Sequence, residues 1–287
     1  MTPSLRPLRS VLYIPGSKPR ALDKARGLAA DAIIFDLEDA VSPDEKTAAR
    51  ETLAQAMAQG GYGTRLRIVR INGLDTDWGL EDARAATAMG AEAILLPKVD
   101  SPAQLDELAK ITGDTALWAM METPLGMLNA AAIAAYPKLQ GMVMGTNDLA
   151  KELQTRFRAD RLPLLTGLGL CLLAAKAHGT AIVDGVYNAY LDEEGLRAEC
   201  QQGRDMGFDG KTLIHPAQLA IANEEFAPSA DEIDLARRQI AAYQDVESSG
   251  QGVAVVDGRI VENLHVVTAR ETLAKHDAIT ALSAEYP

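Results

Sequence analysis

Short apolar segments recur along the first three quarters of the chain, separated by stretches with helical periodicity. Each segment is almost continuous in Val, Ile, Leu or Met, which is typical of a parallel β-strand buried on both faces. Strands that alternate with helices predict an α/β fold with a parallel sheet. The eight segments are residues 11–14, 32–36, 66–71, 93–96, 117–121, 141–144, 181–183 and 211–214.

Charged side chains close several of these segments or follow them directly. One such charge would be an accident, but six in succession indicate a ring of strands whose C-terminal ends share one polar site. We therefore predict a (β/α)8 TIM barrel. A doubly wound sheet is the alternative, but the chain lacks the glycine-rich first turn of dinucleotide-binding folds. The six residues are Asp36, Arg70, Lys98, Glu122, Asp148 and Asp184.

The pattern changes in the last quarter of the chain. We expect a helix over residues 229–248, a hairpin that turns at Asp257-Gly258, and a final helix over residues 266–284. The predicted domains are a catalytic barrel, residues 1–225, and a C-terminal extension, residues 226–287. The extension is either a packing and oligomerisation element or a lid over the mouth of the barrel, and the periodicity favours neither.

Composition excludes several classes of partner. A net charge of −12 argues against nucleic acid and anionic membrane surfaces. No apolar stretch reaches the roughly 18 residues that cross a bilayer. The first ten residues lack the apolar core of a signal peptide. Cys171 and Cys200 fall in helical segments, where we expect reduced, buried thiols, so a cytoplasmic location fits.

Glu122 and Asp148 end the predicted fifth and sixth strands, which are neighbours in a barrel. Two carboxylates without nearby histidines make an oxygen site that suits Mg²⁺, which uses few protein ligands and completes its shell with water and substrate. The alternative is that each carboxylate caps a helix or pairs with a lysine. The two interpretations have similar weight at this point.

Three further polar features surround the predicted mouth. Arg70 ends the third strand, where it would clamp a substrate carboxylate, pair with the acidic cluster that begins at Asp36, or do both. Glu38 of that cluster is a candidate catalytic residue, because histidines are sparse and acid–base work falls to carboxylates. Lys18 and Lys24 flank a helix start after Pro-Gly-Ser, which suits phosphate, although such lysines are usually only solvated.

These motifs together resemble one enzyme family. PGSKP, DLEDAVSPDEKTAAR, RING, LPK, MET-P, GTNDL, VDGVY and GFDGKTLIHP occur here in the order found in the citrate-lyase-beta-like enzymes of the HpcH/HpaI aldolase superfamily. The resemblance covers essentially the whole chain. The segments RINGLDT and DLEDAVSPD are most similar to the malyl-CoA and β-methylmalyl-CoA lyase branch, which has a malyl-CoA thioesterase relative.

The resemblance implies a metal-dependent barrel that acts on CoA thioesters of hydroxy acids, with Mg²⁺ as the metal and Mn²⁺ as an alternative. It further implies a homotrimer or homohexamer in which the extension closes over a neighbouring barrel. Glu122 and Asp148 match the family's metal carboxylates, and Arg70 matches the arginine that holds the hydroxy-acid carboxylate. Tyr13, Lys18 and Lys24 match CoA contacts, and Asp184 and Gly185 match a loop near the pantetheine arm.

The family's lid carries an aspartate in a Gly-x-hydrophobic-hydrophobic-Asp pattern. The matching segment here runs from Gly258 to Glu262, so the carboxylate is a glutamate. Asp257 is a second candidate for the same role. The extra methylene moves the carboxyl group by about 1 Å, a displacement that changes rates substantially.

The leading expectation is a lyase that cleaves (3S)-malyl-CoA or β-methylmalyl-CoA into an acyl-CoA and glyoxylate. The metal would polarise the β-oxygen, and Arg70 would orient the acid. The closest alternative is a (3S)-malyl-CoA thioesterase, in which Glu262 or Asp257 activates water and the products are malate and CoA. Two others stay open: a citryl-thioester lyase subunit, and a barrel that only binds CoA esters.

Overall fold

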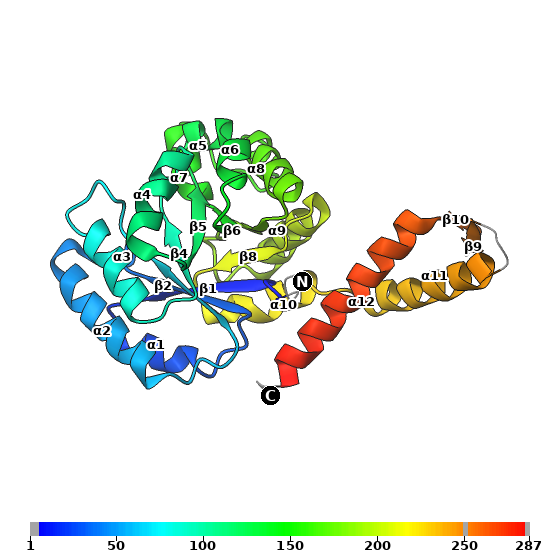
Figure 1. The fold of residues 1–287 in the computed structure, drawn as a ribbon, viewed down its shortest axis with the longest axis horizontal. Helices are drawn as coiled ribbons and strands as arrows, with labels where there is room; N and C mark the ends of the chain where they lie inside the picture. The colour runs from blue at the N-terminus through cyan, green and yellow to red at the C-terminus, as the bar shows by residue number, and fades with distance from the viewer. Residues whose placement is uncertain (1–5, 249–251, 285–287) are drawn as a thin grey trace. The chain divides into compact units, whose positions relative to one another are not determined.

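Eight parallel strands close into a barrel in chain order, with β1 pairing β8 (Figure 1). This computed structural model describes residues 6–248 and 252–284. The barrel prediction is confirmed, and every predicted segment matches its strand to within two residues at either end. The strands are β1 (Ser10–Pro15), β2 (Ala32–Asp36), β3 (Leu66–Arg70), β4 (Ala93–Leu96), β5 (Ala116–Met121), β6 (Leu139–Met144), β7 (Ala181–Asp184) and β8 (Gly210–Leu213).

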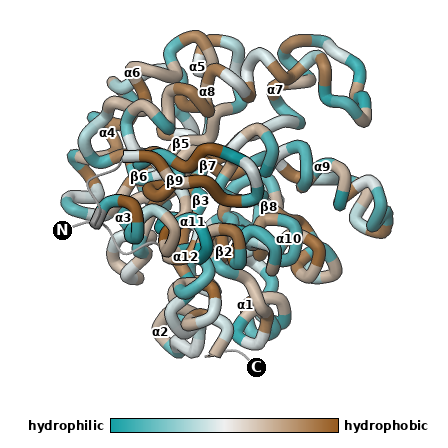
Figure 2. Tube along the Cα trace, turned by 90° about the vertical axis from the view of Figure 1, so that its right-hand side faces the viewer, coloured by the Kyte–Doolittle hydropathy of each residue, from teal (hydrophilic) through white to brown (hydrophobic). Residues whose placement is uncertain are grey.

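Helices follow the strands and surround the barrel. Figure 2 shows mixed hydrophilic and hydrophobic colours along helices such as α9. A capping box of Ser101 and Gln104 begins α4, and Gly113 ends it with a φ of 59°. The helices are α1 (Pro19–Ala25), η1 (Pro43–Glu45), α2 (Lys46–Gln59), α3 (Gly79–Ala88), α4 (Pro102–Thr112), α5 (Pro124–Leu128), α6 (Ala130–Ala134), α7 (Thr146–Glu152), α8 (Leu165–His178), α9 (Glu193–Met206), η2 (Pro216–Gln218) and α10 (Leu219–Glu225).

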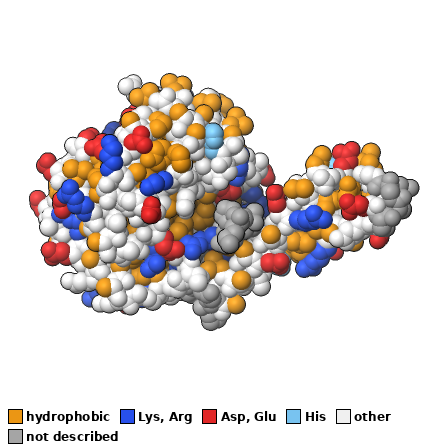
Figure 3. Space-filling view, viewed as in Figure 1, with side chains coloured by type: hydrophobic (Ala, Val, Ile, Leu, Met, Phe, Trp, Pro, Cys, Tyr) orange, Lys and Arg blue, Asp and Glu red, His pale blue; other side chains and the backbone are white. Residues whose placement is uncertain are grey.

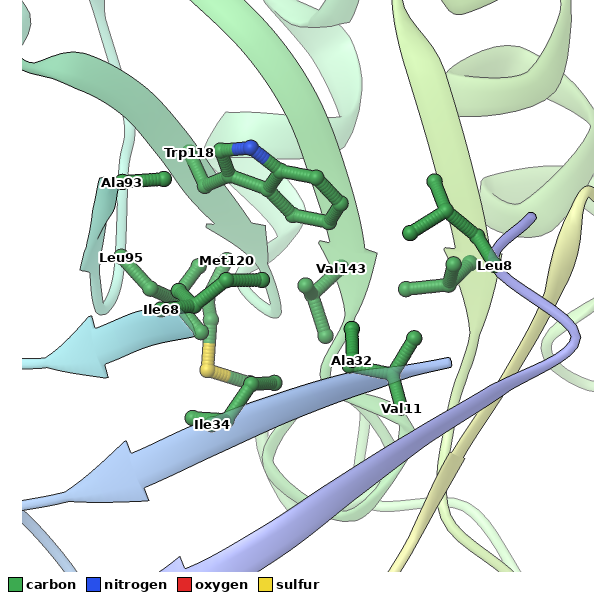
Figure 4. Close-up of a cluster of buried hydrophobic side chains, with 11 residues drawn as sticks. Leu8, Val11, Ala32, Ile34, Ile68, Ala93, Leu95, Trp118, Met120 and Val143 are labelled. Atoms are coloured by element: carbon green, nitrogen blue, oxygen red, sulfur yellow. The ribbon is translucent and has the colours of Figure 1, made fainter. Parts of the chain in front are cut away.

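Side chains fill the interior of the barrel, so it is a packed core and not a pore. In Figure 4, the indole of Trp118 on β5 points toward Val143 on β6, and Met120 on β5 extends toward Ile34 on β2. Trp118 covers Gly141 so closely that a Cβ atom at Gly141 would collide with the indole. The packed interior therefore leaves the rim at the strand ends as the place for a ligand-binding site.

The strand register brings the terminal charges together at that rim. Asp36 at the end of β2 is the register partner of Arg70 at the end of β3. Glu122 directly follows β5, and Asp148 lies in the first turn of α7 after β6. The shared polar site that the strand-end charges predict is therefore present in the fold.

The outer surface of the barrel carries an apolar area. Leu125 and Leu128 of α5 and Leu170 and Leu173 of α8 are exposed. Figure 3 shows hydrophobic side chains gathered at the top of the barrel, where Figure 1 places these helices. Among the described residues, no helix combines the length and hydrophobicity that a bilayer crossing needs.

The contacts of the chain divide it into a larger unit, Leu8–Glu224, and a smaller unit that includes the described residues from Glu225 onward. The smaller unit holds α11 (Ala230–Ser248), β9 (Ala254–Val256), β10 (Arg259–Val261) and α12 (Asn263–Ala284). Its hairpin turns at Asp257 and Gly258, both with positive φ, as the Asp-Gly pair predicts. Ala254, Val256, Val261 and Val266 form its buried cluster.

Candidate active site

A cavity of about 310 Å³ opens at the C-terminal rim of the barrel. Its walls include Tyr13, Arg70, Glu122 and Asp148, which come from four different parts of the barrel sequence. The structure thus brings together the predicted metal pair, the predicted carboxylate clamp and one predicted CoA contact. This convergence defines the candidate active site.

Glu122 is almost fully buried and is held in place by the backbone. Its Oε1 accepts a 2.8 Å hydrogen bond from the backbone N–H of Lys98, a residue with a φ of 49°. Burial raises the pKa of Glu122 to about 7; the Lys98 N–H opposes this rise, and the charge of Asp148 adds to it. Two carboxylates close enough to repel each other are a site for a cation.

The donor set fits Mg²⁺. Neither Glu122 nor Asp148 forms an ion pair with a described residue, so the predicted alternative of lysine pairing does not apply to them. No group of three or more His, Cys, Asp or Glu side chains that could hold a metal occurs in the described ranges. A complete protein cage is therefore absent there, and two carboxylates plus water and substrate match the way Mg²⁺ is usually held. Mn²⁺ suits the same oxygen ligands.

Arg70 is buried and oriented by the acidic cluster. Its Nε and Nη2 donate to the two oxygens of Asp36 at 2.7 and 2.6 Å. Its Nη1 lies 2.7 Å from Glu38 and 3.3 Å from Asp39, whose side chain is exposed. The guanidinium carbon lies 4.9 Å from the ring centre of Tyr13. Arg70 therefore pairs with the acidic cluster while it lines the cavity, and its contact with a substrate carboxylate stays a prediction.

Glu38 lies beside this guanidinium and is largely buried. Burial raises the pKa of its carboxyl group to about 8, although the charge of Arg70 works in the opposite direction. Its Oε2 is near Arg70 but has no hydrogen bond of acceptable geometry. A carboxyl group that is protonated at neutral pH is suited to donate a proton.

The other predicted barrel residues lie in different surroundings. Lys18 is exposed and lies 3.5 Å from Glu45, and Lys24 is exposed in the last turn of α1. Asp184 is fully buried in ion pairs. Gly185 lies so close to Thr146 that a Cβ atom would collide with its side chain. Direct contact between these four positions and CoA stays a prediction.

The two predicted lid carboxylates belong to the smaller unit. Asp257 accepts two 2.7 Å hydrogen bonds from Nη1 of Arg238, which ties it to α11. Glu262 has an exposed side chain, and its backbone N–H donates to Nδ1 of His265 at 3.0 Å. Of the pair, Glu262 is the carboxylate without an ion pair to any residue that the structure describes, and its catalytic role stays a prediction.

Sequence reasoning missed a buried ionic group under the rim. Nη1 of Arg161 donates to both oxygens of Asp184 at 2.8 and 2.7 Å. Lys211, also fully buried, lies 3.3 Å from Asp184 and 2.6 Å from Glu199. The sequence did contain a signal for Lys211, because a lysine inside a buried strand needs a partner of opposite charge. Arg161 lies in a polar loop, where nothing in the sequence distinguishes it.

The chain belongs to the HpcH/HpaI aldolase/citrate lyase family, whose model matches residues 9–216. It is 67% identical over 284 residues to a (3S)-malyl-CoA thioesterase of Cereibacter sphaeroides, covering 99% of this chain and 100% of the relative. It is 35% identical to the citrate lyase subunit beta of Leuconostoc mesenteroides subsp. cremoris, covering 92% of each chain. The resemblance seen in the motifs is confirmed.

Solved structures agree with the fold. CitE from Mycobacterium tuberculosis, in complex with magnesium, acetoacetate and coenzyme A, matches with a TM-score of 0.79 and 32% identity. The match covers 93% of this chain and 97% of that chain. RipC from Yersinia pestis matches with a TM-score of 0.68 and 32% identity, covering 78% and 97%. The family thus includes a member that binds magnesium and coenzyme A, and members that are enzymes.

Proposed function

We propose that this protein hydrolyses (3S)-malyl-CoA to malate and CoA, with Mg²⁺ held by Glu122 and Asp148. The observation that carries the proposal is one cavity lined both by a buried, oriented arginine and by two carboxylates that have no ion pair within the described part of the chain. The identity of 67% with (3S)-malyl-CoA thioesterases supports hydrolysis over the C–C cleavage that the motifs put first. A metal bound there would supply polarisation of a substrate oxygen.

Arg70 would hold the carboxylate of the malyl group. Asp36 occupies Nε and Nη2, so the substrate would bind at Nη1 and displace the exposed carboxylate of Asp39. Because Asp36 fixes the plane of the guanidinium, the acid would be oriented before the reaction begins. Tyr13, stacked against Arg70, would limit the movement of the same group.

Hydrolysis adds water across the C–S bond and leaves a carboxylic acid and a thiol. Glu38, protonated near neutral pH, is the barrel residue suited to give a proton, and Glu262 of the smaller unit is the candidate base for water. The barrel is thereby assigned a proton donor and the smaller unit a candidate base, the two roles that hydrolysis requires.

Cleavage of the C–C bond of the same substrate is the second candidate. Identity with citrate lyase beta subunits and the aldolase family model favour it. The two reactions give different products, so one assay separates them. Purified protein is incubated with (3S)-malyl-CoA and Mg²⁺, and free thiol, malate, acetyl-CoA and glyoxylate are measured together.

Malate with an equal amount of free thiol would support the thioesterase. Glyoxylate with acetyl-CoA and no thiol would support the lyase instead. A barrel that only binds CoA esters would give neither pair, and the same result would count against both catalytic proposals.

We also propose that the protein is a homo-oligomer. The exposed leucines of α5 and α8 support this, because apolar areas on a surface are commonly covered by a partner. Light scattering on the purified protein should give a multiple of the chain mass of 30.6 kDa. The resemblance favours three or six copies, and the mass of a single chain would contradict the proposal.

A further inference from the structure

The loop after β2 carries two carboxyl groups that lie beside Arg70 in the candidate active site, those of Glu38 and Asp39. This loop folds over the end of its own strand, because the backbone N–H groups of Glu38 and Ala40 donate to the two carboxylate oxygens of Asp36 at 2.9 and 3.0 Å. The place of the Glu38 carboxyl group therefore depends on what fixes the backbone of this loop.

Lys46, the first residue of α2, contacts the backbone of the same loop. Its side chain is buried, and its Nζ donates to the carbonyl oxygens of Leu37 at 3.2 Å and Glu38 at 2.9 Å. The Nζ also lies 5.3 Å from the centre of the Trp78 ring, a distance at which a cation and an aromatic face attract each other. One lysine thus joins helix α2, the loop after β2 and the segment before α3.

The charge of Lys46 has no carboxylate partner among residues 6–248 and 252–284. A buried ammonium group without a counter-charge is uncommon, because moving it out of water is costly. Arg50, one turn later on α2, shows the usual arrangement, since it lies 3.0 Å from the buried carboxylate of Asp82. Two carbonyl dipoles and an aromatic face stand in for an ion pair at Lys46.

The two carbonyl groups do not depend on Lys46 for a hydrogen bond. Nδ2 of Asn72 donates to the Leu37 carbonyl at 2.8 Å, and the backbone N–H of Val41 donates to the Glu38 carbonyl at 3.0 Å. A lysine that only satisfied backbone acceptors would thus be redundant at this position. What Lys46 adds is a second hydrogen bond to each carbonyl, which holds the loop in one conformation, as the residues that support a catalytic group do.

We propose that Lys46 is a positioning residue of the active site, which fixes the loop after β2 so that the carboxyl group of Glu38 stays against Nη1 of Arg70. The inference rests on the proposed function, in which Glu38 is the proton donor, and deepens it. Without Lys46 the loop keeps its other hydrogen bonds, so the protein still folds, but the Glu38 side chain is free to turn toward solvent. A displacement of about 1 Å at such a group lowers a rate substantially.

A double-mutant cycle tests this role without requiring turnover. Lys46→Met keeps most of the length of the side chain and removes the ammonium group, and it is combined with Glu38→Gln. Urea unfolding of the unaltered protein, both single variants and the double variant is measured with EDTA at about pH 6 and about pH 9. If Lys46→Met does not fold, Lys46→Gln, which is neutral but polar, takes its place in the same cycle.

We expect Glu38→Gln to reduce the loss of stability between these pH values when Lys46 is present. After Lys46→Met the same substitution should have less than about half of this effect, because a Glu38 side chain that turns into water titrates as it does in the unfolded chain. A general loss of stability from the buried substitution cancels in this comparison. The charged and titratable groups around Glu38 are the same in both backgrounds: Tyr13, Asp36, Asp39, Arg70, Lys98 and Glu122.

Turnover of (3S)-malyl-CoA, measured as loss of the substrate whichever products form, is the second readout. Lys46→Met should lower the turnover about tenfold in the unaltered protein but less than about twofold in the Glu38→Gln background. Lys138→Met is the matched control. Lys138 also donates to a backbone carbonyl, that of Gly113 at 2.6 Å, but it precedes β6 at the opposite end of the barrel, so its substitution should change neither readout.

Equal effects of Glu38→Gln on the pH dependence in both backgrounds would overturn the positioning role. The absence of any effect in both would overturn it too, because Glu38 would then not be held as proposed. So would a tenfold loss of turnover that Lys46→Met also causes in the Glu38→Gln background. The products of the reaction judge the proposed function separately: hydrolysis with equal pH effects refutes the positioning role alone, and unequal effects without hydrolysis refute the proposed reaction alone.

Discussion

Gly145 and Glu122 lie so close that a Cβ atom on Gly145 would come within 3.0 Å of the Cβ of Glu122. The backbone N–H of Gly145 also donates to the carbonyl of Met121 at 2.9 Å. The glycine therefore leaves the space in which the Glu122 carboxylate turns toward the cavity. Three residues later the chain presents Asp148, so one turn shapes both halves of the candidate metal site.

Gly145→Ala should weaken Mg²⁺ binding by at least about tenfold, because the added methyl group pushes the Glu122 side chain aside. Titration calorimetry with Mg²⁺ measures this directly, without depending on turnover. Gly169→Ala in α8 is the matched control, because no atom lies within 4 Å of the Cβ it would add. Unchanged Mg²⁺ affinity in the Gly145 variant would show that Glu122 does not need this space.

Glu122→Gln and Asp148→Asn should each lower hydrolysis of (3S)-malyl-CoA by at least about 100-fold, since a neutral amide binds the metal far more weakly than a carboxylate. Turnover is measured over a range of Mg²⁺ concentrations, and partial rescue at high Mg²⁺ is expected. Glu152→Gln is the matched control, because it neutralises an exposed carboxylate at the end of α7, the helix that carries Asp148. Full activity in either site variant would remove that residue from the metal site.

Glu38→Gln should make stability less dependent on pH. Burial raises the pKa of Glu38 to about 8 in the folded protein, so the folded state retains a proton that the unfolded state releases. The stability from this group is fully present below its ordinary pKa and is lost as pH rises through about 8. A glutamine is neutral throughout, so the variant should lose less stability between about pH 6 and pH 9.

Urea unfolding in the presence of EDTA measures this difference, because metal is then removed from the neighbouring carboxylates. Glu51→Gln, on the exposed face of α2, is the control and should follow the unaltered protein. An identical pH slope for Glu38→Gln would mean that the carboxyl group titrates normally.

The strand positions could be predicted because buried parallel strands need continuous apolar sequence, and in this chain little else has that pattern. The charges lie at the ends of the strands, so the grouping of Arg70, Glu122 and Asp148 at the rim could also be predicted. The hydrogen bonds and burial around these three side chains could not. The positive φ of Lys98, which aims its N–H at Glu122, depends on packing between β4 and β5 and leaves no trace in residue type.

The buried ionic group under the rim was beyond prediction for a related reason. Arg161 and Asp184 are 23 positions apart, and their pairing arises from the three-dimensional path of the loop before α8. Asp184 was expected near the pantetheine arm because of its motif, whereas its carboxylate lies buried against Arg161 and Lys211. A strand-end carboxylate in sequence can thus serve the substrate or the fold, and only burial and partners separate the two.

Asp184→Asn should destabilise the protein by about 3–5 kcal/mol, because it leaves Arg161 and Lys211 buried without their shared counter-charge. Burial alone would raise the pKa of Asp184, but Lys211 and Arg161 outweigh burial and hold it below its usual range. The stability that Asp184 contributes is therefore present above the ordinary pKa of an aspartate. It is lost as the pH falls through the lowered pKa of Asp184 in the folded protein. Asp184→Asn should therefore lose less stability on acidification than the unaltered protein does.

Urea unfolding at neutral and acidic pH tests both statements. Asp160→Asn is the matched control: Asp160 also pairs with an arginine, Arg158, but both side chains are exposed, so little stability should change. If Asp184→Asn unfolded at the same urea concentration as the unaltered protein, the buried ionic group would not hold the loop after β7. That loop would then have to be stabilised by other contacts, such as the paired amides of Asn147 and Asn188.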